Sequence, residues 1–158
     1  MELYHKLKQT ALAAELTDEQ ARILAELGST SELAEGEFLI EEGASDDSLY
    51  VLLDGRLEVV KQAGMGEAVT LHILRPGDIS GELSFVDRQP HTLSLRALYQ
   101  CKVFGLRRDR FETLITREPR LVFEVMCAIM RSAHAILHRM NLQHMELTNY
   151  VYKQHGRY

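Results

Sequence analysis

The stretch LYVLLDGRLEV, residues 49–59, decides the fold. Two apolar runs flank Asp54-Gly55, and both central residues of a tight hairpin turn must tolerate positive φ, which aspartate and glycine do. The pair therefore predicts a β-hairpin. Other short runs rich in Val, Leu, Ile, Phe and Tyr lie between glycines around it: EFLIEEG, AVTLHIL, TLSLRAL and CKVFGL. Strands at this spacing predict an all-β roll or sandwich, with a second hairpin tip at AGMGE, residues 63–67.

Residues 92–97 alternate between polar and apolar side chains. Leu93, Leu95 and Ala97 fall on one side of such a strand, which predicts one buried face and one polar face. In TLHIL, residues 70–74, the same reasoning places His72 on the polar side.

Helical patterns flank the predicted strands. Residues 1–28 look helical: Thr17 and Gln20 have the spacing of a capping box, and Gly28 is a plausible stop. Residues 107–117 predict a short helix. A long helix is expected over residues 119–150, because Pro119 suits the first position of a helix, where its missing N–H costs nothing.

The long helix carries apolar residues at alternating steps of four and three. This heptad stripe comprises Val122, Met126, Ile129, Ala133, Ile136, Met140, Gln143, Leu147 and Tyr150. A stripe sustained over four repeats is typical of paired helices and predicts a parallel homodimer, whose register Gln143 could fix. In the alternative, the stripe packs on the β-roll of its own chain.

Composition excludes several classes of protein. The 158 residues carry a net charge of −5, with no basic surplus to bind nucleic acid. Two cysteines without a CxxC spacing indicate a reducing compartment. There is no signal-peptide pattern, and no uncharged apolar run approaches the roughly 20 residues of a membrane span. These features predict a cytoplasmic protein without a membrane or DNA partner.

Four segments together resemble the cyclic nucleotide-binding domain, the sensor module of the catabolite activator protein family and of protein kinase A regulatory subunits. They are GEFLIEEG at 36–43, LYVLLDGRLEV at 49–59, LRPGDISGELSF at 74–85 and PHTLSLRA at 90–97. The resemblance implies a single domain, residues 1–158, that is mainly β with flanking helices. Its core would be a double-stranded β-helix, a jelly-roll-like β-roll over residues 36–106, between N-terminal helices and a long C-terminal dimerisation helix.

The resemblance also implies a phosphate-binding cassette that opens at Gly81. Glycine lets the backbone approach a ligand closely. The N–H groups of Glu82, Leu83 and Ser84 would point out of a first helical turn that offers them no carbonyl, an arrangement that suits an anion. By the same resemblance, Glu82 would accept a hydrogen bond from a ribose 2′-hydroxyl.

His91 departs from the family pattern, which has an arginine at this position. An arginine grips two phosphate oxygens with a permanent charge, whereas a histidine offers one donor and is mostly neutral near pH 7. Losing such a charge-assisted bond weakens binding roughly 10- to 150-fold. Thr92 could still donate a hydroxyl, and Arg88 is either a substitute cation or a solvated loop charge.

On the purine side, the resemblance places Ser132, Ile136 and Leu137 of the long helix. Only Ser132 can form a hydrogen bond there. Cyclic AMP and cyclic GMP are therefore candidate ligands with weakened contacts on two sides of the pocket.

These observations predict a non-catalytic sensor that acts through a homodimer and an unknown protein partner. The chain ends at Tyr158, without the helix-turn-helix of the family's transcription factors, so a stand-alone module is expected. Two alternatives are a ligand-free scaffold and a binder of a different nucleotide second messenger. No catalytic motif is evident, because the strands offer His72 alone where a β-roll oxygenase needs a histidine cluster.

A metal site is not expected on the long helix. Cys127, His134 and His138 lie near one another there, and the two histidines have the spacing of a metal pair. A pair without a further ligand is usually a polar helix face.

Overall fold

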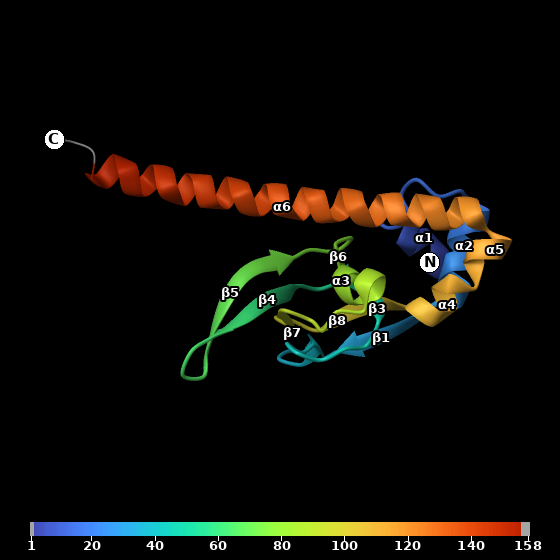
Figure 1. Ribbon diagram of the computed structural model, residues 1–158, viewed down its shortest axis with the longest axis horizontal. Coiled ribbons are helices and arrows are strands. Elements are labelled where there is room, and N and C mark those ends of the chain that lie inside the picture. The colour runs from blue at the N-terminus through green and yellow to red at the C-terminus, as the bar shows by residue number, and fades with distance from the viewer. Residues whose placement is uncertain (1, 156–158) are drawn as a thin grey trace.

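Two four-stranded antiparallel sheets form the β-roll (Figure 1). The computed structural model describes residues 2–155, with the side chains of all of these except 143, 144 and 152–155. The first sheet runs in the order β1 (Ser29–Leu33), β8 (Cys101–Arg107), β3 (Ser48–Asp54) and β6 (Ile79–Ser80). The second runs in the order β2 (Phe38–Ile40), β7 (Ser94–Ala97), β4 (Leu57–Ala63) and β5 (Glu67–Leu74).

Six helices flank the roll in the described part of the chain. They are α1 (Leu3–Lys8), α2 (Asp18–Leu27), α3 (Glu82–Asp87), α4 (Arg108–Glu112), α5 (Leu114–Arg117) and α6 (Pro119–His155). Figure 1 shows α1, α2, α4 and α5 gathered around the beginning of α6, which then runs over the roll. The predicted fold, a β-roll with flanking helices and a long C-terminal helix, is confirmed.

Several local predictions are also confirmed. Thr17 and Gln20 form the capping box, with both reciprocal hydrogen bonds present. Pro119 opens α6. The β4–β5 hairpin turns at residues 64–66. The roll begins earlier than its sequence pattern indicates, because β1 pairs with β8 although only Leu33 of that strand is buried.

The hairpin predicted at Asp54-Gly55 is wrong, because β3 and β4 belong to different sheets. β3 pairs with β6 and β8, whereas β4 pairs with β5 and β7. The turn therefore carries the chain across the roll. Gly55 is required at this corner for two reasons: its φ is +91°, and a Cβ would lie 2.6 Å from the Gln100 carbonyl oxygen and 2.7 Å from Cys101 Sγ.

The predicted orientation of β5 is also wrong. His72 is buried, with 8% of its surface exposed, while its apolar neighbours Leu71 and Ile73 are 42% and 44% exposed. β5 is an edge strand, and α6 contributes Arg139 to cover its histidine. The face that carries the histidine is therefore the inner one, contrary to the simple apolar-inside rule.

The core divides into two clusters. One joins the N-terminal helices, the first sheet and the beginning of α6, and the other fills the roll between the two sheets. Leu121, Val125 and Ile129 anchor α6 in the first cluster, and Ile136 packs against the second. These residues hold α6 on its own roll.

The heptad stripe of α6 is thus divided between two environments. Ile129 is only 6% exposed and packs within its own chain, as in the alternative stated above, so it is not available to a partner. Other apolar side chains of α6 are exposed, some in the stripe and some next to it. They are Phe123, Met126, Met130, Leu137 and Leu147. By length and composition the stretch Pro119–Val151 is also long and apolar enough to cross a membrane, and 28% of its most apolar window is buried within the domain. The side chain of Gln143 lies outside the described residues.

Replacing Gly55 with alanine should destabilise the fold by about 1–3 kcal/mol more than replacing Gly36. Both glycines have similar positive φ, +91° and +88°, so both variants carry a left-handed strain of about 1–2 kcal/mol. Only Gly55 has close neighbours, since no described atom lies within 4 Å of a Cβ at Gly36. Urea unfolding measures the difference, and equal stabilities of the two variants would contradict it.

Candidate functional site

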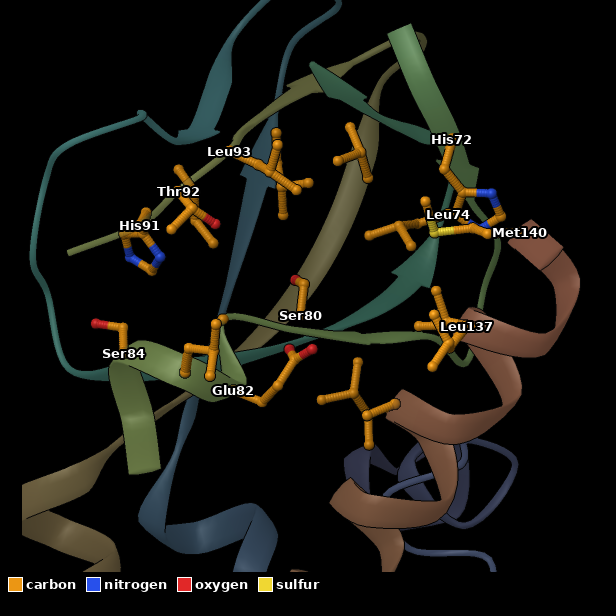
Figure 2. Close-up of a pocket in the computed structure, with 18 residues that line it drawn as sticks. His72, Leu74, Ser80, Glu82, Ser84, His91, Thr92, Leu93, Leu137 and Met140 are labelled. Carbon is orange, nitrogen blue, oxygen red and sulfur yellow. The ribbon is translucent and has the colours of Figure 1, made fainter. Parts of the chain in front are cut away.

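A cavity of about 290 Å³ lies between the roll and α6 (Figure 2). Strands of both sheets, the loop before β7, α3 and α6 contribute to its wall. Most lining residues are aliphatic. The polar ones are His72, Ser80, Glu82, Ser84, His91 and Thr92. The cavity therefore has the mostly apolar lining with a few polar groups that small-molecule sites share.

Gly81 sets the position of α3 at the cavity. Its φ of +80° starts the helix in the left-handed region, and a Cβ would lie 2.7 Å from the Ser48 carbonyl oxygen of β3. The Phe85 amide then donates to the Gly81 carbonyl at 3.0 Å, which closes the first turn. Because of this tight junction, the first turn of α3 faces the cavity as the sequence predicts, and Gly81, Glu82, Leu83 and Ser84 all line it.

Glu82 directs its carboxylate into the cavity (Figure 2). Burial raises the pKa of this carboxyl, whereas a hydrogen bond from its own backbone amide and the nearby His91 lower it. The carboxylate therefore partly caps the first amide of α3. It is also the acceptor that a hydroxyl group of a ligand would meet.

His91 lies on the far side of the cavity from α6 (Figure 2). Its Nε2 is 2.9 Å from Oδ1 of Asp46, in the loop between β2 and β3. The His91 amide donates to the Ala44 carbonyl, and the Gly43 amide donates to the His91 carbonyl. Asp46 in turn accepts a 2.6 Å hydrogen bond from the Tyr50 hydroxyl. The imidazole is thus tied to a neighbouring loop, through a partner that the sequence gave no reason to expect.

Ser84 and Thr92 differ in how available their hydroxyls are. Ser84 is buried, and its Oγ accepts a hydrogen bond from the Asp47 amide at 3.2 Å. Thr92 is exposed and lines the cavity, while its carbonyl accepts from Lys61 Nζ at 3.1 Å. Ser84 therefore holds the loop before β3, and the Thr92 hydroxyl remains a candidate donor to a ligand.

Arg88 is a solvated loop charge rather than a substitute for the missing arginine. Its side chain is 61% exposed, and its guanidinium lies 3.6 Å from Glu112 of α4. It does not belong to the described lining of the cavity.

The α6 wall consists of Ala133, Ile136, Leu137 and Met140. Ile136 and Leu137, which the resemblance places on the purine side, both line the cavity, and their contact with a purine stays a prediction. Ser132 is buried but lies outside the lining, one turn before Ile136 on the same face of the helix. Ala133, Ile136 and Met140, which the heptad pattern assigned to a partner helix, line the cavity.

A polar cluster that the sequence did not predict joins α6 to the roll beside the cavity. Arg139 Nη2 lies 2.8 Å from Asp78 Oδ2 and 3.3 Å from His72 Nε2. Since arginine can only donate, His72 accepts through Nε2 and carries its proton on Nδ1. Burial, followed by the charge of Arg139, lowers the pKa of His72. His72 Nδ1 and Arg139 Nε have no hydrogen-bond partner among the described residues.

His134 and His138, considered above as a metal pair, are both exposed on α6. Within residues 2–155, leaving aside the side chains not described, no three His, Cys, Asp or Glu residues are grouped as a metal site would require. Both cysteines are free, Cys101 buried and Cys127 half-buried.

Comparison with known proteins identifies relatives. A family model for the cyclic nucleotide-binding domain matches residues 30–118, more than half of the chain. The chain is 32% identical over 109 residues to the cAMP-dependent protein kinase regulatory subunit of Emericella nidulans, covering 69% of this chain and 26% of the relative. It is 27% identical over 96 residues to the CRP-like cAMP-activated global transcriptional regulator of Mycobacterium tuberculosis, covering 61% and 43%. The match thus spans less than half of either relative.

Among solved structures, a cyclic nucleotide-binding domain from Methylobacillus flagellatus superimposes with a TM-score of 0.79. The identity is 22%, and the match covers 89% of this chain and 79% of the other. At this identity the likeness establishes the shared fold.

Replacing His72 with glutamine should weaken the loss of stability on acidification. The lowered pKa of the folded His72 means that the unfolded chain binds its proton first, so the free energy of unfolding falls as pH drops below about 6.5. Glutamine retains an acceptor for Arg139 but does not titrate. Thermal unfolding between pH 7.5 and pH 5 tests this, with exposed His134→Gln as the matched control. An unchanged pH dependence in His72→Gln would contradict the prediction.

Proposed function

The chain belongs to the cyclic nucleotide-binding domain family, and from that premise we propose that it is a non-catalytic regulatory module that binds a small ligand between the roll and α6. The observation that carries the proposal is the first turn of α3, which brings the Glu82 carboxylate and the neighbouring residues Leu83 and Ser84 to the wall of a cavity. An open cavity favours ligand binding over the alternative of a ligand-free scaffold, which needs no such space.

Cyclic AMP is the first ligand to test, because both curated relatives are named for it. Cyclic GMP and cyclic dinucleotides are further candidates. His91 argues for weak binding of these anions, since its Nε2 is already engaged by Asp46 and it offers no fork of donors. A cyclic nucleotide would therefore depend on the α3 amides and Thr92 for its phosphate.

The lining also supports a non-catalytic role. The Ser84 hydroxyl accepts from the Asp47 amide and His91 contacts Asp46, so these two residues do not form a nucleophile and base pair with each other. We expect a cytoplasmic protein, in keeping with its two free cysteines, and output through a protein partner.

We propose that two chains form a homodimer through α6. The interface would lie on the exposed side of the helix rather than at Val122 and Ile129. Its residues are Phe123, Met126, Met130, Leu137 and Leu147. They fit a heptad spacing, and such large apolar side chains would gain stability from burial against a second helix. Ala133 and Met140 lie next to these exposed residues and line the cavity. The same helix would therefore contact both the ligand and the partner chain.

Replacing His91 with arginine should strengthen cyclic AMP binding by about tenfold or more, because a charged donor would be added at the phosphate. Asp46 would compete for the new guanidinium, which keeps the gain at the lower end of the expected range. Glu82→Ala should abolish measurable binding, whereas exposed Glu35→Ala outside the cavity should not. Calorimetry measures all three. No effect of His91→Arg would mean that the cassette does not bind a phosphate at this position.

Replacing Met130 with glutamate should give folded monomers. Met130 is 72% exposed, so a charge there disrupts only a contact with a partner. The same change at neighbouring Ile129 should instead unfold the chain, because it buries a charge in the core. Light scattering reports mass and circular dichroism reports folding, with exposed Met65→Glu on the β4–β5 hairpin as the control. Dimers of unchanged stability for Met130→Glu would place the interface elsewhere.

A further inference from the structure

The cavity contains a carboxylate but no permanent cation. Among the described lining residues there is no lysine or arginine, and Glu82 is the one acidic side chain. The two histidines do not supply a free charge. His72 lies beside Arg139, a contact that disfavours its protonation, and any proton on His91 is balanced by Asp46 at 2.9 Å.

Cations near the cavity are committed to other partners. Lys61 pairs with Glu42 at 2.7 Å and binds the Thr92 carbonyl. Arg139 pairs with Asp78, in the loop before β6, at 2.8 Å. Recruiting either to an anion in the cavity would break an existing ion pair. The site therefore presents a buried acceptor without a compensating positive charge, and a phosphate placed there would meet a like charge.

Most polar groups of the cavity lie together. Figure 2 shows Ser80, Glu82, Ser84, His91 and Thr92 toward α3 and the loop before β7, whereas Leu137 and Met140 lie on α6, with the polar His72 on the same side as Met140. Val59 and Leu95 of the second sheet add to the aliphatic wall. A ligand with hydroxyl groups toward Glu82 and a ring toward α6 would match this arrangement. The volume, near the lower end of ordinary ligand sites, limits it to a small molecule.

We propose that this cavity selects an uncharged, hydroxyl-bearing ring compound of the nucleoside class over the corresponding cyclic phosphate. The proposal rests on the proposed function, because it names the ligand class of the same site. The Glu82 carboxylate accepts the ligand's hydroxyls, the α3 amides and Thr92 donate to its oxygens, and the ring lies between the second sheet and α6. Asp46 contributes by holding His91 in a pair that leaves no cationic grip on a phosphate.

Matched ligand pairs test this selection on the full chain. Calorimetry compares adenosine with 3′,5′-cyclic AMP, and guanosine with 3′,5′-cyclic GMP, so that each pair shares its base and 2′-hydroxyl while an anionic phosphodiester replaces the 3′- and 5′-hydroxyls. At least one nucleoside should bind about tenfold or more tightly than its cyclic phosphate. His91→Arg should shift this ratio toward the cyclic phosphate, because the new guanidinium can pair with the phosphate but not with an uncharged nucleoside. Arg88→Gln, outside the cavity, should leave the ratio unchanged.

The outcomes separate this inference from the function on which it rests. Equal or tighter binding of both cyclic phosphates would overturn the inference and leave a ligand-binding regulatory module. Absence of binding by all four compounds at millimolar concentration would overturn both and favour a scaffold. A ratio in His91→Arg equal to that of the unmodified chain would overturn the electrostatic basis of the selection.

Discussion

The close contact between Gly81 and the Ser48 carbonyl oxygen is the constraint on which the site depends. A side chain at this position would collide with β3, and the positive φ of Gly81 directs the chain from β6 into α3. Only this junction brings the first turn of α3, with Glu82 at its start, against the interior of the roll. The same strand, β3, carries Tyr50, whose hydroxyl holds Asp46 and thereby His91. Strand β3 therefore both fixes the backbone of the pocket, through Ser48, and positions the Asp46–His91 pair, through Tyr50.

The electrostatic character of the pocket follows from pairing rather than from the number of charges. Arginines and lysines surround it, but Lys61, Arg88 and Arg139 each face a carboxylate outside the cavity wall. Inside, Glu82 faces aliphatic side chains and backbone amides, and burial raises its pKa. The proposed preference for neutral ligands rests on His91 and on the Asp46 that engages it.

Helix α6 serves the domain and the site at once. Its beginning is fixed by Leu121, Val125 and Ile129 in the core, and Arg139 joins it to β5 and to Asp78. Between these two attachments, Ile136 and its neighbours close the cavity. A ligand that changes how this segment packs would alter the surface that α6 presents to a second chain. Coupling between ligand and partner is thus possible through one rigid element.

The sequence by itself determined the fold class, because glycine-punctuated apolar runs, the capping box at Thr17 and Pro119 are local signals of local structure. It also located Gly81, Glu82 and His91, since these stand at fixed positions in a recognisable segment. Tertiary structure decided the rest: Asp54-Gly55 crosses between sheets, β5 turns His72 inward, and Ser132 lies away from the cavity. Asp46 and His91 are 45 residues apart, so no periodicity relates them. Pairings of this kind are made by three-dimensional packing, whereas the amino-acid pattern along a chain records local features such as turns, helix caps and the alternation of polar and apolar residues.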